Sequence, residues 1–124
     1  MASASVLAIG LDPAAMDPAD LSGFTPELVR AYIDAEIARL GDQGLEVQSC
    51  LIDLGETAEL QVERVLRSRR FDCIVIGAGL REPPERLLLF ERVLNLVHRL
   101  APGSRIAFNT NPGDTAEAAQ RWIG

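Results

Sequence analysis

Segments rich in apolar residues alternate with amphipathic segments along the whole chain. Residues 6–9 and 71–76 are dominated by apolar side chains, whereas residues 45–52 and 104–109 mix apolar side chains with polar or charged ones. Apolar runs are typical of strands that are covered on both faces, and mixed runs are typical of strands at a sheet edge. The pattern therefore predicts two central strands and two edge strands.

Helical spacing follows each predicted strand. The first helix has a clear start signal, in which Thr25 caps the helix and Pro26 takes its first position. Gly41 and Gly44 mark its end. The predicted helices span about residues 26–40, 58–66, 83–100 and 114–122.

Four strands that are each followed by a helix predict a parallel sheet with right-handed crossovers. Placing the first and third strands inside gives the order 2-1-3-4, which is the beginning of the flavodoxin-like order. A Rossmann half, with the order 3-2-1-4, would leave the apolar third strand at an edge. With 124 residues, the chain is expected to form a single α/β domain over residues 1–124, a three-layer sandwich.

The charge of the chain disfavours two classes of partner. The net charge is −6, whereas proteins that bind nucleic acid or anionic membranes usually show a basic face. All 12 basic residues are arginines, which excludes Schiff-base chemistry on a lysine. Since no apolar run reaches the length of a membrane span, we expect a cytoplasmic protein. Cys50 and Cys73 are expected to be buried thiols and not a disulfide.

Ligands of such sheets bind beyond the carboxyl ends of the strands, at the point where the winding reverses. Here that point lies between the first and third strands. Three loops are expected to reach it, and the residues that they carry are Asp12, then Gly77, Ala78, Gly79 and Arg81, and finally Asn109, Thr110 and Asn111.

The segment from Gly77 to Arg81 is the leading candidate for the binding site. Glycines let backbone N–H groups approach a phosphate or carboxylate closely, and Arg81 adds a bidentate contact. We therefore expect a small anionic ligand here, beneath the long connection at residues 11–23. In the alternative interpretation, the glycines only make a tight turn and the connection is ordinary surface.

An enzymatic alternative assigns Asp12 as general acid or base and Asn109 as a positioning group. The protein would then be a hydrolase or transferase acting on a phosphorylated or nucleotide-like substrate. Isolated aspartates after strands also cap helices and turns, which is the competing interpretation. The acidic residues lack metal-ligand spacing, so no metal site is expected, and the pattern indicates no particular cofactor.

The helix at residues 83–100 has an unusually broad apolar surface. Such a surface is either additional core or a subunit interface. We expect a homodimer. In a third interpretation, this surface is the functional part of a protein that acts only through interaction.

Three segments together resemble a group of small uncharacterised bacterial proteins with a flavodoxin-like or Rossmann-like α/β domain. They are Leu11-Asp12-Pro13, the run from Asp53 to Ala58, and the turn Gly77-Ala78-Gly79. The resemblance implies the fold and carries no activity with it. Receiver domains have a similar layout with a phosphate-accepting aspartate where this chain has Gly77, so their chemistry is not implied.

Overall fold

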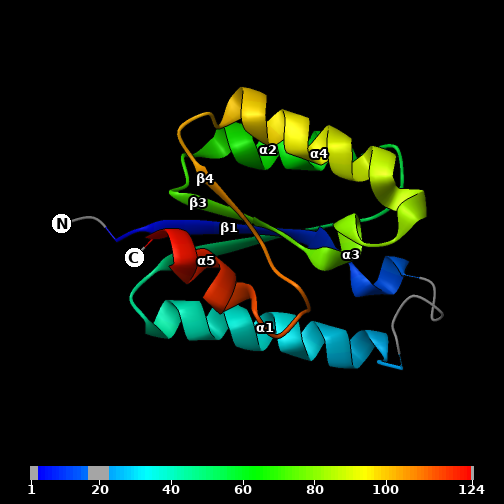
Figure 1. Cartoon of the computed structure of the whole chain (residues 1–124), viewed down its shortest axis with the longest axis horizontal. Coiled ribbons are helices and arrows are strands. Elements are labelled where there is room, and N and C mark those ends of the chain that lie inside the picture. Colours follow the sequence, from blue (N-terminus) through cyan, green and yellow to red (C-terminus); the bar gives the residue numbers. More distant parts are fainter. Residues whose placement is uncertain (1–2, 17–22, 124) are drawn as a thin grey trace.

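The computed structural model describes residues 3–16 and 23–123, and it forms three layers with the sheet in the middle (Figure 1). The elements follow one another as β1 (Ser5–Leu11), η1 (Pro13–Ala15), α1 (Pro26–Asp42), β2 (Glu46–Ile52), α2 (Ala58–Ser68), β3 (Cys73–Ile76), α3 (Ala78–Arg81), η3 (Pro84–Arg86), α4 (Leu87–Leu100), β4 (Arg105–Phe108) and α5 (Thr115–Ile123).

The sheet has the order β2-β1-β3-β4 and every pair of neighbouring strands is parallel. Ile9 of β1 lies opposite Cys50 of β2 and Ile76 of β3, which places β1 between the two. All four residues of β3 are buried, whereas β2 exposes several of its residues. The predicted α/β sandwich with the flavodoxin-like order 2-1-3-4 is confirmed.

The two faces of the sheet are packed very differently. Helices α2 and α4 cover one face, where leucine, isoleucine and valine side chains form the larger core (Figure 1). Helices α1 and α5 cover the other face, where the smaller core includes Ala107 and three alanines of α5. Small side chains fill less volume, so the face beneath α1 and α5 is the one on which space can remain.

The beginning of α1 follows the sequence signals. Thr25 caps the helix, because its Oγ1 accepts a hydrogen bond from the Leu28 N–H at 3.1 Å, and Pro26 occupies the first position. After the helix ends, Gly44 has a φ of +84°, a left-handed conformation that glycine adopts without strain. The start of α1 predicted from Thr25 and Pro26 is confirmed.

The prediction of one helix from Pro83 to Leu100 was wrong at its beginning. The α-helix α4 starts only at Leu87, and a 3-10 turn at Pro84–Arg86 precedes it. Pro83 is extended, with φ −64° and ψ 124°, because a residue before a proline is disfavoured in the helical region. The glycine segment before it is also helical, since Ala78–Arg81 makes the single turn α3.

The connection predicted as a lid at residues 11–23 falls partly on residues 17–22, which lie outside the described residues. Its described part begins with the 3-10 turn η1. No helix in residues 3–16 and 23–123 is long and apolar enough to cross a membrane.

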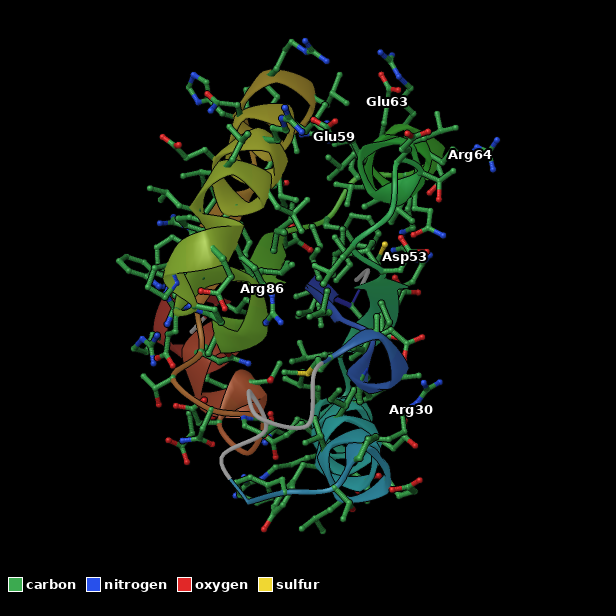
Figure 2. All side chains as sticks on the ribbon, turned by 90° about the vertical axis from the view of Figure 1, so that its right-hand side faces the viewer. Arg30, Asp53, Glu59, Glu63, Arg64 and Arg86 are labelled. Atoms are coloured by element: carbon green, nitrogen blue, oxygen red, sulfur yellow. The ribbon has the colours of Figure 1, made fainter. Side chains whose placement is uncertain are left out.

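Charged side chains are distributed mainly over the outside. Arg30, Asp53 and Arg64 point outward, whereas Arg86 points inward from the segment that precedes α4 (Figure 2). The Arg86 side chain is buried, and its Nη1 donates a hydrogen bond to the Gly79 carbonyl oxygen at 2.8 Å. This contact ties η3 to α3 and fixes the short helical turn against the start of α4.

Candidate functional site

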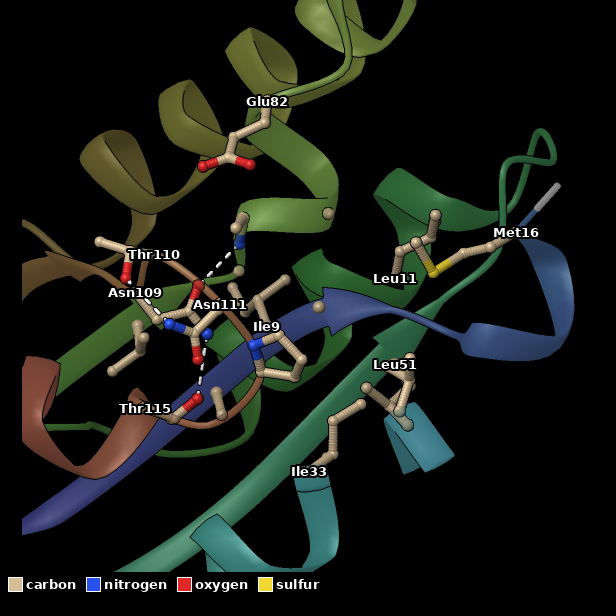
Figure 3. Close-up of a pocket in the computed structure, with 18 of the residues that line it drawn as sticks. Ile9, Leu11, Met16, Ile33, Leu51, Glu82, Asn109, Thr110, Asn111 and Thr115 are labelled. Atoms are coloured by element: carbon tan, nitrogen blue, oxygen red, sulfur yellow. Dashed lines mark hydrogen bonds between the residues drawn. The ribbon is translucent and has the colours of Figure 1, made fainter. Parts of the chain in front are cut away.

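A cavity of about 560 Å³ lies at the carboxyl ends of β1 and β3, between the sheet and α1 (Figure 3). This is the position at which the sheet order predicts a ligand site. Its floor is formed by small residues of two strands, Ala8, Gly10 and Ser49, and one wall by Ile33 and Ile37 of α1. The volume is within the range of small-molecule pockets.

The burial of β1 shows that the cavity reaches the centre of the fold. β1 has a neighbouring strand on each side, yet Ala8 and Gly10 are only half-buried while the residues between and beside them are buried. Ile33 and Ile37 of α1 are also half-buried, although they belong to the stripe that should face the core. Helix α1 and the sheet thus leave open space between them.

Asn109 links two of the segments that form the rim, the open edge of the cavity. Its Oδ1 accepts a hydrogen bond from the Ala78 N–H at 2.7 Å, and its Nδ2 donates to Thr115 Oγ1 at 3.0 Å (Figure 3). The side chain is buried. It therefore connects the beginning of α3 to the beginning of α5 and has both ends of its amide occupied.

Asp114 organises the loop between β4 and α5. Its carboxylate accepts hydrogen bonds from the Thr110 hydroxyl and from the backbone N–H groups of Thr110 and Asn111. Partial burial alone would raise the pKa of Asp114, but these hydrogen bonds and the charge of Arg121 lower it below its ordinary value of 3.8. The carboxylate is therefore a structural anion that shapes the rim.

Arg81 does not line the cavity. Its Nη2 donates to the Asn109 carbonyl oxygen at 2.7 Å, and the guanidinium lies 5.1 Å from the centre of the Phe108 ring. The expected bidentate partner of an anion is thus used to bind α3 to the end of β4.

The N–H groups of Gly77 and Ala78 are also engaged. Gly77 donates to the Ile9 carbonyl oxygen at 2.8 Å, and Ala78 donates to Asn109. A Cβ atom at Gly77 would lie 3.4 Å from that same Ile9 oxygen, an ordinary van der Waals contact. Gly77, Ala78 and Gly79 line the cavity, but the structure does not assemble them with Arg81 into an anion cradle.

Asp12 is placed away from the cavity lining. Its Oδ1 accepts a hydrogen bond from the Ala14 N–H at 3.0 Å, which caps η1, and it lies 3.8 Å from Arg30 Nη1. Asn109 and Thr110, by contrast, do line the cavity. The two residues of the enzymatic alternative, Asp12 and Asn109, are therefore occupied in local structure.

The cavity also contains residues that the sequence patterns did not identify. The floor residues Ala8, Gly10 and Ser49 were missed, as were Glu82 and Glu85 at the rim. Small residues at alternate positions of a central strand were the available signal, since Ala8 and Gly10 point to the same face. No sequence pattern predicted that the two glutamates would lie at the cavity, because their position depends on the turn that separates α3 from α4.

The charge of the lining is negative. Among the described residues that line the cavity, the charged ones are Glu82 and Glu85, and none is an arginine. Within residues 3–16 and 23–123, no group of three histidine, cysteine or acidic side chains is arranged to hold a metal ion. Burial raises the pKa of the Cys50 thiol, and it raises that of Cys73 to about 11.

No protein-family model and no curated protein matches the chain.

Proposed function

We propose that the protein binds a small, largely apolar molecule in the cavity between α1 and the sheet. The observation that carries this proposal is the open space above Ala8 and Gly10 in the central strand. Larger side chains there would fill the space and stabilise the fold, as cavity-filling substitutions commonly do. Space retained at a position where ligands bind in this architecture supports a binding function.

Binding is favoured over catalysis by the state of the polar side chains. Asn109 and Asp114 are held by hydrogen bonds to neighbouring residues, and Asp12 caps a turn outside the lining. A general acid or base must be within reach of the reacting atom of its substrate. These residues support a rim of fixed shape, which suits recognition of a ligand.

An anionic ligand, the expectation from the sequence, is the main competitor. The position of the site supports an anionic ligand, but the charge of the lining does not. Arg81 is bound to the Asn109 carbonyl oxygen, and the charged residues of the lining are the glutamates Glu82 and Glu85. A thermal-shift screen separates the two ligand types. The panel contains tryptophol as a neutral aromatic compound, nucleotides, sugar phosphates and simple carboxylates.

The screen is run on the wild type, Ala8→Leu and Arg81→Ala. A compound at about 100 times its dissociation constant adds roughly 2.7 kcal/mol to the stability of the folded state. We expect tryptophol to raise the melting temperature of the wild type and Arg81→Ala, and to lose its effect in Ala8→Leu. A phosphate or carboxylate that stabilises the wild type and not Arg81→Ala would overturn the proposal in favour of an anion site.

A second candidate function is self-association, and the start of α4 favours it. Leu87 and Leu88 are adjacent and are 56% and 58% exposed, so together they form an apolar patch on the surface. We propose a homodimer through this surface. Sedimentation velocity of Leu88→Glu compared with Asn95→Glu tests it, since both add one charge to an exposed position of α4. A dimer that is lost only in Leu88→Glu supports the interface, and a monomeric wild type contradicts it.

The proposed location is the cytoplasm. Cys50 and Cys73 are both free and buried, a state that reducing compartments maintain. Fractionation of cells that contain the tagged protein would test this location, and recovery in a secreted or membrane fraction would contradict it.

A further inference from the structure

We propose that the ligand carries a protonated amine on its apolar body, with the amine placed at the glutamates of the rim. This inference rests on the proposed function and specifies its ligand class. The floor and the α1 wall determine the apolar body, and the negative charge of the rim determines the head group.

Several donors of the rim are already used. Asn109 donates to Thr115, the Thr110 hydroxyl donates to Asp114, and Asn111 Nδ2 lies 3.3 Å from Thr110 Oγ1, to which it donates. The N–H of Ala78 at the start of α3 is bound to Asn109. A ligand carboxylate or phosphate would need such donors, and these ones would have to give up existing bonds.

The carbonyl oxygens of the turn are used as well. Gly77 accepts from the Leu80 N–H, Ala78 accepts from the Glu82 N–H, and Gly79 accepts from Arg86. The charged groups that the rim offers to a ligand are carboxylates. Glu82 and Glu85 are both exposed, and Glu82 points toward the side of the cavity where Thr110 and Asn109 lie (Figure 3).

Neighbouring cations neutralise these carboxylates only in part. Arg81 Nη2 is 3.9 Å from Glu82 Oε1 and has its shorter contact, 2.7 Å, with the Asn109 carbonyl oxygen. Arg86 lines a separate cavity beside the start of α2, which it shares with Glu85. Glu82 is thus the carboxylate assigned to this site, and Glu85 adds negative potential at its border. An ammonium group both donates hydrogen bonds and complements this charge.

Three indole compounds test the inference, because they share one ring and differ in the charge of the head group. They are tryptamine with an ammonium, tryptophol with a hydroxyl and indole-3-acetate with a carboxylate. Dissociation constants are measured by titration in ¹H–¹⁵N correlation spectra. We expect tryptamine to bind roughly two- to fivefold more tightly than tryptophol, the range that exposed ion pairs allow, and indole-3-acetate to bind most weakly.

Variants identify the carboxylates that are responsible. Glu82→Gln should reduce the preference for tryptamine over tryptophol, and the double variant Glu82→Gln with Glu85→Gln should abolish it. Glu91→Gln, an exposed glutamate of α4 outside the cavity lining, is the matched control and should keep the preference.

The outcomes separate the two proposals. Indole-3-acetate binding as tightly as tryptamine, or a preference for tryptamine that survives in the double variant, overturns the inference about the amine. Tryptophol that binds without any preference for tryptamine overturns that inference and leaves the proposed function standing. Tryptophol that does not perturb the cavity residues counts against the proposed function itself.

Discussion

Ala8→Leu is expected to stabilise the protein, because the added carbon atoms enter the cavity above β1. The substitution adds three carbon atoms, each worth about 0.8 kcal/mol when removed from water. Fixing the leucine side chain costs about 0.5–1 kcal/mol of rotamer entropy, which leaves a gain of about 1.5 kcal/mol. For a chain of 124 residues, with an unfolding entropy of about 2.1 cal/mol/K per residue, the melting temperature should rise by about 6 °C.

The matched control is Ala107→Leu. Ala107 lies on the same face of the sheet but is buried against the alanines of α5, where no comparable space is left. Overpacking there should destabilise the protein by about 1–3 kcal/mol. Chemical denaturation of both variants gives the two free energies of unfolding. If Ala8→Leu destabilises the protein as Ala107→Leu does, the space above β1 is not available and the reasoning is refuted.

Three further predictions concern the rim and the core. Asn109→Ala should lower the free energy of unfolding by about 2–3 kcal/mol in denaturant titrations, since it leaves the buried Thr115 and the half-buried Ala78 without their hydrogen bonds; a loss below 0.5 kcal/mol would contradict this role. The pKa of Asp114 is lower in the folded state than in the unfolded state. The Asp114 carboxylate therefore stabilises the fold fully at a pH above its unfolded-state pKa, and this stabilisation is lost as the pH falls through its folded-state pKa. Asp114→Asn should therefore flatten the acid limb of stability measured against pH, and an unchanged limb would argue against it. Cys73, whose pKa is raised to about 11 by burial, should resist alkylation at pH 8 in the native protein and react after unfolding, whereas rapid native labelling would show that it is accessible.

Most of the fold was predictable because hydrophobic pattern and strand order are linked. The apolar run of β3 requires cover on both faces, and the polar positions of β2 require an edge, so the order 2-1-3-4 followed from those two strands. Local signals also identified the start of α1, where Thr25 and Pro26 act within the chain itself. The start of α4 was misplaced because the conformation of Pro83 depends on the proline after it.

The candidate site was predictable in position but not in chemistry. The strand order pointed to the ends of β1 and β3, where the structure has a cavity that Asn109 and Thr110 line. The role of Arg81 was not predictable, since its contacts with Asn109 and Phe108 arise between segments that are distant in sequence. The cavity above Ala8 and Gly10 was also not predictable, because it depends on the space that α1 leaves between itself and the sheet. Helical spacing shows that Ile33 and Ile37 lie on one side of α1, but it does not show that they leave this space unfilled.

The most direct test of the central claim is a measurement of intermolecular nuclear Overhauser effects between tryptophol and the methyl groups of the protein. Binding in the cavity predicts effects from the indole ring to the methyl groups of Ala8, Ile33 and Ile37, which line it from two layers of the fold. These effects should disappear in Ala8→Leu. Effects confined to Leu87 and Leu88 on the outer surface, or none at a saturating concentration of tryptophol, would contradict the proposed binding function.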